Sequence, residues 1–265
     1  GNLCHMKGDW DEAIQHFQSS LEAFDSLGDA QGTSTILNNL GNVYADLGDS
    51  LQAIKYYTMS IESKESLGDR HGVAITIGNL GSIYFRQGQW QKAKEHYQQS
   101  LETFQELGDR RGMANSLLGL GYVNGQWGQW EKAIECYSLC LGIQNELEDS
   151  GGMINTLNSM ANAYHRLGRW EEAVSQYHDS LKTLRSRGDI AGVAAALSNL
   201  GNIFSNQGDW INADSCYKES LEILDGLGDI HNIAIIHNNL GNLYYQSGDW
   251  TKALEHYSQG WEAFD

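Results

Sequence analysis

Apolar side chains recur along the chain at helical spacing, and short polar turns interrupt this pattern at regular intervals. One stripe has spacings of 4, 3, 4 and 3, at Val73, Ile77, Leu80, Tyr84 and Gln87. After a turn at Gly88 a second stripe keeps this rhythm, at Trp90, Ala93, Tyr97, Ser100, Leu101 and Phe104. Such spacing puts one buried stripe on each helix. The pattern therefore predicts pairs of amphipathic helices joined by tight turns.

The helix pair recurs along the whole chain with a period of 40 residues and no gap. One column is glycine in every row, at Gly8, Gly48, Gly88, Gly128, Gly168, Gly208 and Gly248. A second column is alanine from Ala13 to Ala253, and a third is aromatic from Phe17 to Tyr257. Tryptophan opens the second helix in every row except at Ser50. Such a period is typical of repeat proteins, whose units pack on their neighbours.

Glycine and aspartate mark where the helices end and begin. We expect Gly68 to end one helix in the left-handed conformation. Asp69 should cap the next helix by accepting hydrogen bonds from free backbone N–H groups. Gly81 lies inside a helix, where its missing side chain should let the partner helix approach closely. The chain has 30 glycines but no proline, which fits an all-helical chain because proline breaks helix interiors.

The columns resemble the tetratricopeptide repeat. Its pattern is matched by Leu80, Gly81, Tyr84, Gly88, Ala93, Tyr97 and Ser100. The usual period is about 34 residues and ends in proline, whereas here it is 40 and a Leu-Gly-Asp-Arg link replaces the proline, as at residues 67–72. This long variety is similar to Pins-type polarity adaptors and to bacterial multi-domain proteins, and more distantly to kinesin light chains. The resemblance implies an all-α, right-handed superhelical solenoid whose first helices line the concave side.

We expect one array of seven units across residues 1–265. The units are residues 1–28, 29–68, 69–108, 109–148, 149–188, 189–228 and 229–265, the first of them incomplete. The chain starts with Gly1 and both ends cut through a unit, so we expect a fragment of a longer protein.

Asparagines recur on the first helices at positions that the packed stripe does not use. Pairs four residues apart share one helix face, which should point into the groove; these are Asn38 with Asn42, Asn158 with Asn162, and Asn238 with Asn242. Asn2 and Asn202 keep half of the pair, and Ser82 and Ser198 are shorter substitutes. An uncharged amide is both donor and acceptor, and the resemblance implies that such asparagines hold the backbone of a ligand. The alternative is that they bond only to each other or to neighbouring turns. We expect Asn39, Asn79, Asn199 and Asn239 to be structural.

Selectivity must come from groove positions that differ between units. One variable column contains Phe85, His165 and Tyr245, and the next contains Arg86 and Arg166. The two arginines could hold a ligand carboxylate through forked hydrogen bonds, or they could form weak salt bridges at the rim.

The fourth unit departs from the others. Gly119, Gly121 and Gly125 lie in one helix, and Leu118 and Tyr122 replace the polar ladder there. With Ile75, Gly78 and Phe85 of the preceding unit they could form an apolar pocket halfway along the groove. Two alternatives stay open: a flexible joint, because three glycines weaken a helix by roughly 2–3 kcal/mol, or simple drift.

Charge and composition exclude several classes of function. The net charge is −17, which argues against nucleic acid and anionic membranes. No stretch of 18 apolar residues predicts a membrane span, and no secretory signal is apparent. The four cysteines have no disulfide-like spacing, so we expect reduced thiols and a cytoplasmic location.

No enzymatic chemistry is predicted, and we expect neither a cofactor nor a metal. The run Gly-Leu-Gly-Tyr-Val-Asn-Gly at 119–125 lacks the strand that a dinucleotide site requires. Cys140 lies in a column of small residues, so packing explains it. Cys136 shares its column with histidines of other units, about 10 Å apart at the usual helix spacing, too far for one zinc ion.

The sequence therefore predicts a non-enzymatic scaffold for protein–protein interaction. Its groove would bind an extended or helical segment of another protein. The alternative is a sensor or regulatory arm of a larger effector, such as a signalling ATPase or a caspase-like protease, that binds an attached domain of the same protein. A third possibility is a structural role in which the ends of chains stack.

Overall fold

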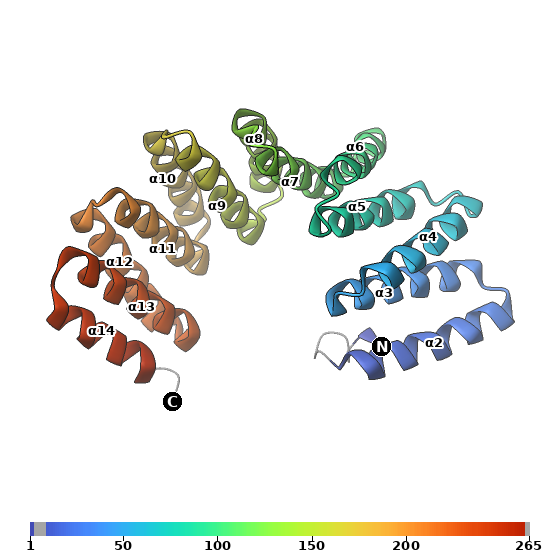
Figure 1. Ribbon diagram of the computed structural model, residues 1–265, viewed down its shortest axis with the longest axis horizontal. Coiled ribbons are helices and arrows are strands. Elements are labelled where there is room, and N and C mark those ends of the chain that lie inside the picture. The colour runs from blue at the N-terminus through green and yellow to red at the C-terminus, as the bar shows by residue number, and fades with distance from the viewer. Residues whose placement is uncertain (3–8, 263–265) are drawn as a thin grey trace. The chain divides into compact units, whose positions relative to one another are not determined.

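The computed structural model describes residues 1–2 and 9–262, which fold into helices joined by short turns without a strand (Figure 1). The first helices of the units are α3 (Ala30–Leu47), α5 (Arg70–Arg86), α7 (Arg110–Gln126), α9 (Ser150–Arg166), α11 (Ile190–Gln207) and α13 (Ile230–Ser247). The second helices are α2 (Trp10–Leu27), α4 (Ser50–Ser66), α6 (Trp90–Leu107), α8 (Trp130–Glu146), α10 (Trp170–Arg187), α12 (Trp210–Leu227) and α14 (Trp250–Glu262). Cys4, His5 and Gly8 lie outside the described residues.

The chain divides into two compact units, Gly1–Ile143 and Gln144–Asp265, with the division inside α8. Each contains consecutive helix pairs that pack as repeats. In the first, α5 contacts α7; in the second, α11 contacts both α9 and α13. Within each compact unit the first helices therefore form one continuous layer. Across the first helices from α3 to α13 the only acidic residue is Asp46.

The turns follow the predicted chemistry. Gly68 has φ +70° and Gly88 has φ +73°, in the left-handed region that a side chain disfavours. The carboxylate of Asp69 accepts from the backbone N–H of Gly72 at 2.9 Å and caps α5, as predicted. Glu148 takes the left-handed position in the turn before α9, with φ 56°. The other units carry glycine there.

Glycines inside the first helices make room for tyrosine rings of the second helices. A Cβ at Gly41 would lie 2.5 Å from the ring of Tyr57, and one at Gly121 would lie 2.2 Å from the ring of Tyr137. Both rings are buried in the core of their unit. The prediction that this glycine column allows close packing is confirmed, and the contacting group is a tyrosine ring.

A column of small polar residues fastens four of the described second helices to the first helix of their own unit. The hydroxyls of Ser60, Ser100 and Ser220 donate to backbone carbonyls of α3, α5 and α11 at 2.8–2.9 Å. Cys140 does the same through its thiol, which donates to the carbonyl of Ala114 at 3.2 Å. Packing explains this cysteine, as the sequence indicated.

At two interfaces between neighbouring repeats, a buried polar side chain takes a position that is apolar in the other repeats. Lys64 is 7% exposed and donates from Nζ to Thr76 Oγ1 at 2.8 Å and to the Gly72 carbonyl at 3.3 Å. Burial lowers the pKa of Lys64, although nearby Asp69 opposes the shift. In the second compact unit Thr156 donates to the side-chain oxygen of Gln144 at 2.8 Å. Phe24, Phe104, Leu184 and Leu224 fill the equivalent position elsewhere.

Candidate functional site

Hollows lie along the first helices in both compact units. In the first, a cavity of about 820 Å³ lies between α5 and α7, and one of about 400 Å³ lies between α3 and α5. Asn79 and Ser82 line both, so the two cavities adjoin each other. In the second, cavities of about 250 and 240 Å³ share Asn199. Each compact unit therefore carries a groove along its first helices.

Tyrosine hydroxyls hold the groove asparagines in one orientation. Tyr57 donates to Asn42 Oδ1 at 2.7 Å. The same contact joins Tyr217 to Asn202 at 2.7 Å and Tyr257 to Asn242 at 2.8 Å. Burial raises the pKa of Tyr57 and of Tyr217, so both hydroxyls keep their protons at neutral pH. Because Oδ1 is occupied, the Nδ2 donors are the part of these amides left to the groove.

The fifth repeat shows what the tyrosine contact depends on. Ala161 replaces the glycine of the other units, where an added Cβ would come within 2.2–3.0 Å of the tyrosine ring. Tyr177 here donates to Asn158 instead of Asn162. Asn158, Asn162 and Asn202 all line the cavity between α9 and α11. The extra methyl group has therefore moved the contact by one helical turn.

Other amides bond across neighbouring repeats. Asn38 accepts from Thr76 Oγ1 at 3.0 Å, which ties it to the contact of Lys64. Asn79 donates from Nδ2 to Asn42 Oδ1 at 3.4 Å. Asn238 is exposed on α13 near Gly260, whose added Cβ would lie 3.2 Å from the amide oxygen. Some amides of the ladder thus take part in a structural network within the chain.

The cavity of about 820 Å³ lies where the sequence suggested an apolar pocket. Ile75, Gly78, Leu118 and Tyr122 line it. The equivalent cavity three repeats later measures about 240 Å³. Smaller residues line the larger cavity and account for the difference in volume. It has Gly78, Gly112 and Ser116 where the smaller cavity has Ser198, Asn232 and Ile236.

Phe85 does not line this cavity, in contrast to the sequence-based expectation. Its ring packs against the core around Tyr97 and Val123, and its centroid lies 6.1 Å from that of Tyr122. It therefore packs against Tyr122, which lines the cavity, without lining the cavity itself.

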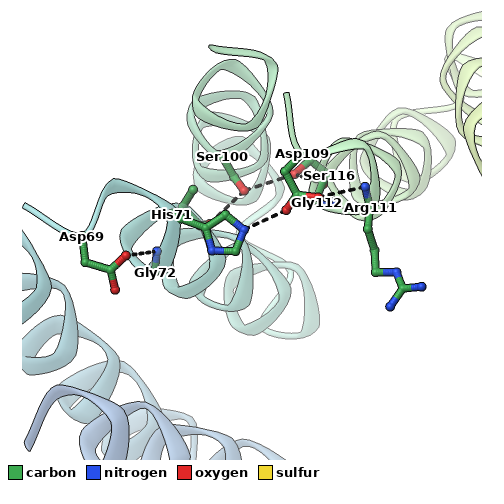
Figure 2. A network of polar contacts seen from close by, with 9 residues as sticks. Asp69, His71, Gly72, Ser100, Asp109, Arg111, Gly112 and Ser116 are labelled. Carbon is green, nitrogen blue, oxygen red and sulfur yellow. Dashed lines mark hydrogen bonds and ion pairs between the residues drawn. The ribbon is translucent and has the colours of Figure 1, made fainter. Parts of the chain in front are cut away.

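A polar network forms one side of the large cavity (Figure 2). His71 Nε2 and Asp109 Oδ2 lie 2.9 Å apart and join α5 to the start of α7. Burial alone would raise the pKa of Asp109, but hydrogen bonds from the Gly112 N–H and from His71 lower it overall. The guanidinium of Arg111 points away from this pair in Figure 2. The cavity thus has an apolar floor and a charged rim.

The remaining predicted groove residues have partners within the chain. Arg86 donates to the Ala45 carbonyl at 2.9 Å, in the last turn of α3, and lines the smaller cavity. This contact was not predicted from the sequence. Arg166 is exposed in the last turn of α9. His165 packs on Trp170 with centroids 4.2 Å apart, and Tyr245 packs on Trp250 at 5.0 Å.

The family model described as tetratricopeptide repeat matches residues 1–66, 72–146, 126–186 and 192–264. The chain belongs to the tetratricopeptide repeat family. The predicted family and the all-α solenoid of helix-turn-helix repeats are therefore confirmed. Membership supports a role in protein interaction, and this scaffold is typically non-catalytic. A search of curated proteins found no significant match.

Solved structures share the fold of this tetratricopeptide array. BtubC (BKLC) from P. vanneervenii is 25% identical, with a TM-score of 0.67, over 81% of this chain and 90% of that one. A signal transduction ATPase (STAND) protein with a tetratricopeptide repeat sensor, from Pyrococcus horikoshii, is 16% identical with a TM-score of 0.72. The match covers 98% of this chain and 40% of that protein. A putative kinesin light chain with nearly identical TPR-like repeats, from Podosopora anserina, is 17% identical with a TM-score of 0.60, over 73% and 95%.

Several residues that shape the groove were missed from the sequence. The tyrosines that orient the asparagines lie 15 residues after them in three repeats, a constant spacing that could have revealed the pairing. Asn79 and Asn199, expected to be structural, each line two cavities. Arg111 could not be recognised from the sequence because its column has no common residue type: it otherwise holds Gln31, His71, Gly151, Ala191 and His231.

Within the described residues no helix is long and apolar enough to cross a bilayer.

Proposed function

We propose that the tetratricopeptide array is a scaffold that binds an extended or partly helical segment of another protein in the grooves along its first helices. The observation that carries the proposal is the tyrosine–asparagine contact at Asn42, Asn202 and Asn242. A tyrosine that occupies the amide oxygen leaves the Nδ2 donors directed to the ligand. Donors of this kind pair with backbone carbonyls whatever the ligand sequence.

The amides would fix the backbone of the segment. Asn158, Asn162, Asn202 and Asn206 line one cavity between α9 and α11, so a segment there meets several donors within a short distance. Each hydrogen bond contributes about 0.5–1.5 kcal/mol. Two or three such bonds hold an extended segment in register but do not choose its sequence.

The large cavity and the arginines would select the sequence. Ile75, Leu118 and Tyr122 offer a socket of about 820 Å³ for an apolar anchor side chain, which is within the range of known ligand pockets. Arg86 and Arg166 remain candidates for a carboxylate of the segment. The rarity of acidic residues on the first helices favours such a contact, because a ligand carboxylate meets little repulsion there.

The same groove could serve a sensor or regulatory arm that binds an attached effector domain of its own protein. Both versions use the same amides and the same socket. They differ in whether the captured segment belongs to another polypeptide, which the capture experiment below determines.

The test begins with capture and ends with a titration. The untagged array, immobilised through lysines, is incubated with lysate, and retained segments are mapped by cross-linking and mass spectrometry. A synthetic peptide of the mapped segment is then titrated against the wild type and against Asn158→Ala and Asn162→Ala. Each variant should weaken binding about 5- to 10-fold, or about 1 kcal/mol. Arg166→Ala reports on the carboxylate contact.

Two controls separate the groove from the rest of α9. Asn155→Ala changes an exposed amide on the same helix that lines none of the cavities described here, and it should leave the affinity unchanged. Tyr217→Phe releases the oxygen of Asn202 without removing its amide, and should weaken binding by less than removal of the amide. Equal affinity of the wild type and both groove variants would exclude the amide mechanism.

A further inference from the structure

The last described repeat brings two histidines together where the other repeats have a different pairing. His237 lies on α13 and His256 on α14. Their Nδ1 atoms are 3.1 Å apart, and their ring centroids are 5.4 Å apart with the planes at 29°. Both side chains are half-buried, so water reaches them from one side.

His237 occupies a position that is otherwise apolar and buried. The equivalent residues of the other described repeats are Leu37, Ile77, Leu117, Leu157 and Leu197, all of them buried. A histidine here gives up apolar packing and places a ring nitrogen at the α13–α14 contact. His256 lies in a variable column that contains Tyr56, Cys136 and Gln176 in other repeats. The pair occurs in no other described repeat.

Charged side chains lie near the pair. Asp225 acts on His237, while Asp214, Glu255 and Lys218 act on His256. Carboxylates therefore outnumber the single ammonium around the two rings, which favours a bound cation. Imidazole binds metal through a ring nitrogen that carries a free lone pair.

We propose that His237 and His256 bind a divalent transition-metal ion through their Nδ1 atoms. Zinc–nitrogen bonds are about 2.0–2.1 Å long, so two nitrogens on one ion lie about 2.9–3.4 Å apart at ordinary angles. The separation of 3.1 Å fits this range without any movement of the helices. Imidazole suits zinc, copper and nickel, whereas magnesium and calcium prefer oxygen.

The ring of His256 is held by two neighbours. The side chain of Gln259 hydrogen-bonds to it. The ring also stacks on Tyr244, with centroids 5.4 Å apart and planes at 6°. Partners that fix the ring orientation are common at metal-binding histidines. Within the described residues no group of three His, Cys, Asp or Glu side chains forms a metal cluster, so water completes the coordination.

The experiment measures metal binding by the untagged array, so that no added histidines compete. Zinc and nickel are titrated by calorimetry at pH 7.5, with magnesium as the negative probe. The variants are His237→Leu and His256→Gln, which carry residues found at these positions in other repeats and should therefore fold, as circular dichroism verifies. His178→Ala, an exposed histidine on α10, is the matched control.

We expect the wild type and His178→Ala to bind one equivalent of zinc, and each site variant to bind at least tenfold more weakly. Zinc should raise the melting temperature of the wild type and of the control but not of His237→Leu. Binding should weaken from pH 7.5 to pH 6 because protons compete for the lone pairs. No zinc binding by the wild type, or equal binding by His237→Leu, would overturn the site and leave the pair as a simple hydrogen bond.

Discussion

Replacement of Gly41 by alanine tests whether the groove asparagines are oriented by the packing beneath them. Gly41 precedes Asn42 on α3, and its Cβ would lie 2.5 Å from both Cδ1 and Cε1 of Tyr57. Contacts this short are repulsive, so the ring of Tyr57 must move. The hydrogen bond of 2.7 Å from its hydroxyl to Asn42 should then break.

The expected change in stability combines three terms. Alanine favours a helix over glycine by about 1 kcal/mol. Overpacking of a close-packed interior costs about 1–3 kcal/mol, and the lost hydrogen bond costs about 0.5–1.5 kcal/mol. Because the two unfavourable terms exceed the favourable one, Gly41→Ala should lower the free energy of unfolding by about 0.5–3.5 kcal/mol.

The assay is urea denaturation followed by circular dichroism, with Gly142→Ala as the matched control. Gly142 is a glycine inside α8 of the same compact unit, and a Cβ there would meet nothing within 4 Å. It should therefore gain up to about 1 kcal/mol from helix propensity alone. If both variants shift the midpoint upward alike, the argument that Tyr57 needs the glycine is wrong.

Three further changes have definite expected results. Ala161→Gly should let Tyr177 return to Asn162, visible as an exchange of the two protected asparagine amides by NMR. Lys64→Leu should remove a rise in wild-type stability between the lowered pKa of the folded state and about 10.4, since there the unfolded chain binds the extra proton; equal pH profiles of the two proteins would refute this. Glu148→Gly should raise the free energy of unfolding by about 1 kcal/mol, and with it the urea midpoint, because the φ of 56° suits glycine; a lower midpoint would argue against strain.

The fold could be predicted almost completely from the sequence, because every repeat carries the same pattern of residue types. The columns of Gly48, Ala53 and Tyr57 each fix one feature of a unit, and agreement across rows removes the ambiguity of a single stretch. Glu148 was not anticipated as a left-handed residue, since the aspartate that follows it kept the pattern intact. The row departs from the glycine column at this one residue, so the column pattern alone did not predict its conformation.

The candidate site could be predicted only in outline. The periodicity indicated which residues face the groove, and the cavity does lie at Ile75, Leu118 and Tyr122. It could not indicate hydrogen-bond partners, because Asn42 bonds to a tyrosine of a different helix and Arg86 bonds to a carbonyl of a different repeat. The meeting of His237 and His256 likewise depends on the distance between two helices, which a column comparison does not contain.

The buried polar contacts between repeats have a consequence for any attempt to rearrange the modules. Lys64 needs a following helix that offers an acceptor such as the Thr76 hydroxyl, whereas Gln144 needs one that offers a donor such as the Thr156 hydroxyl. Placed before a helix with isoleucine at that position, as at Ile36 or Ile236, either side chain would lose its partner in the interior. Shuffled or duplicated modules should therefore assemble well at the apolar junctions and poorly at these two. The buried polar side chains thus restrict which repeat can follow which.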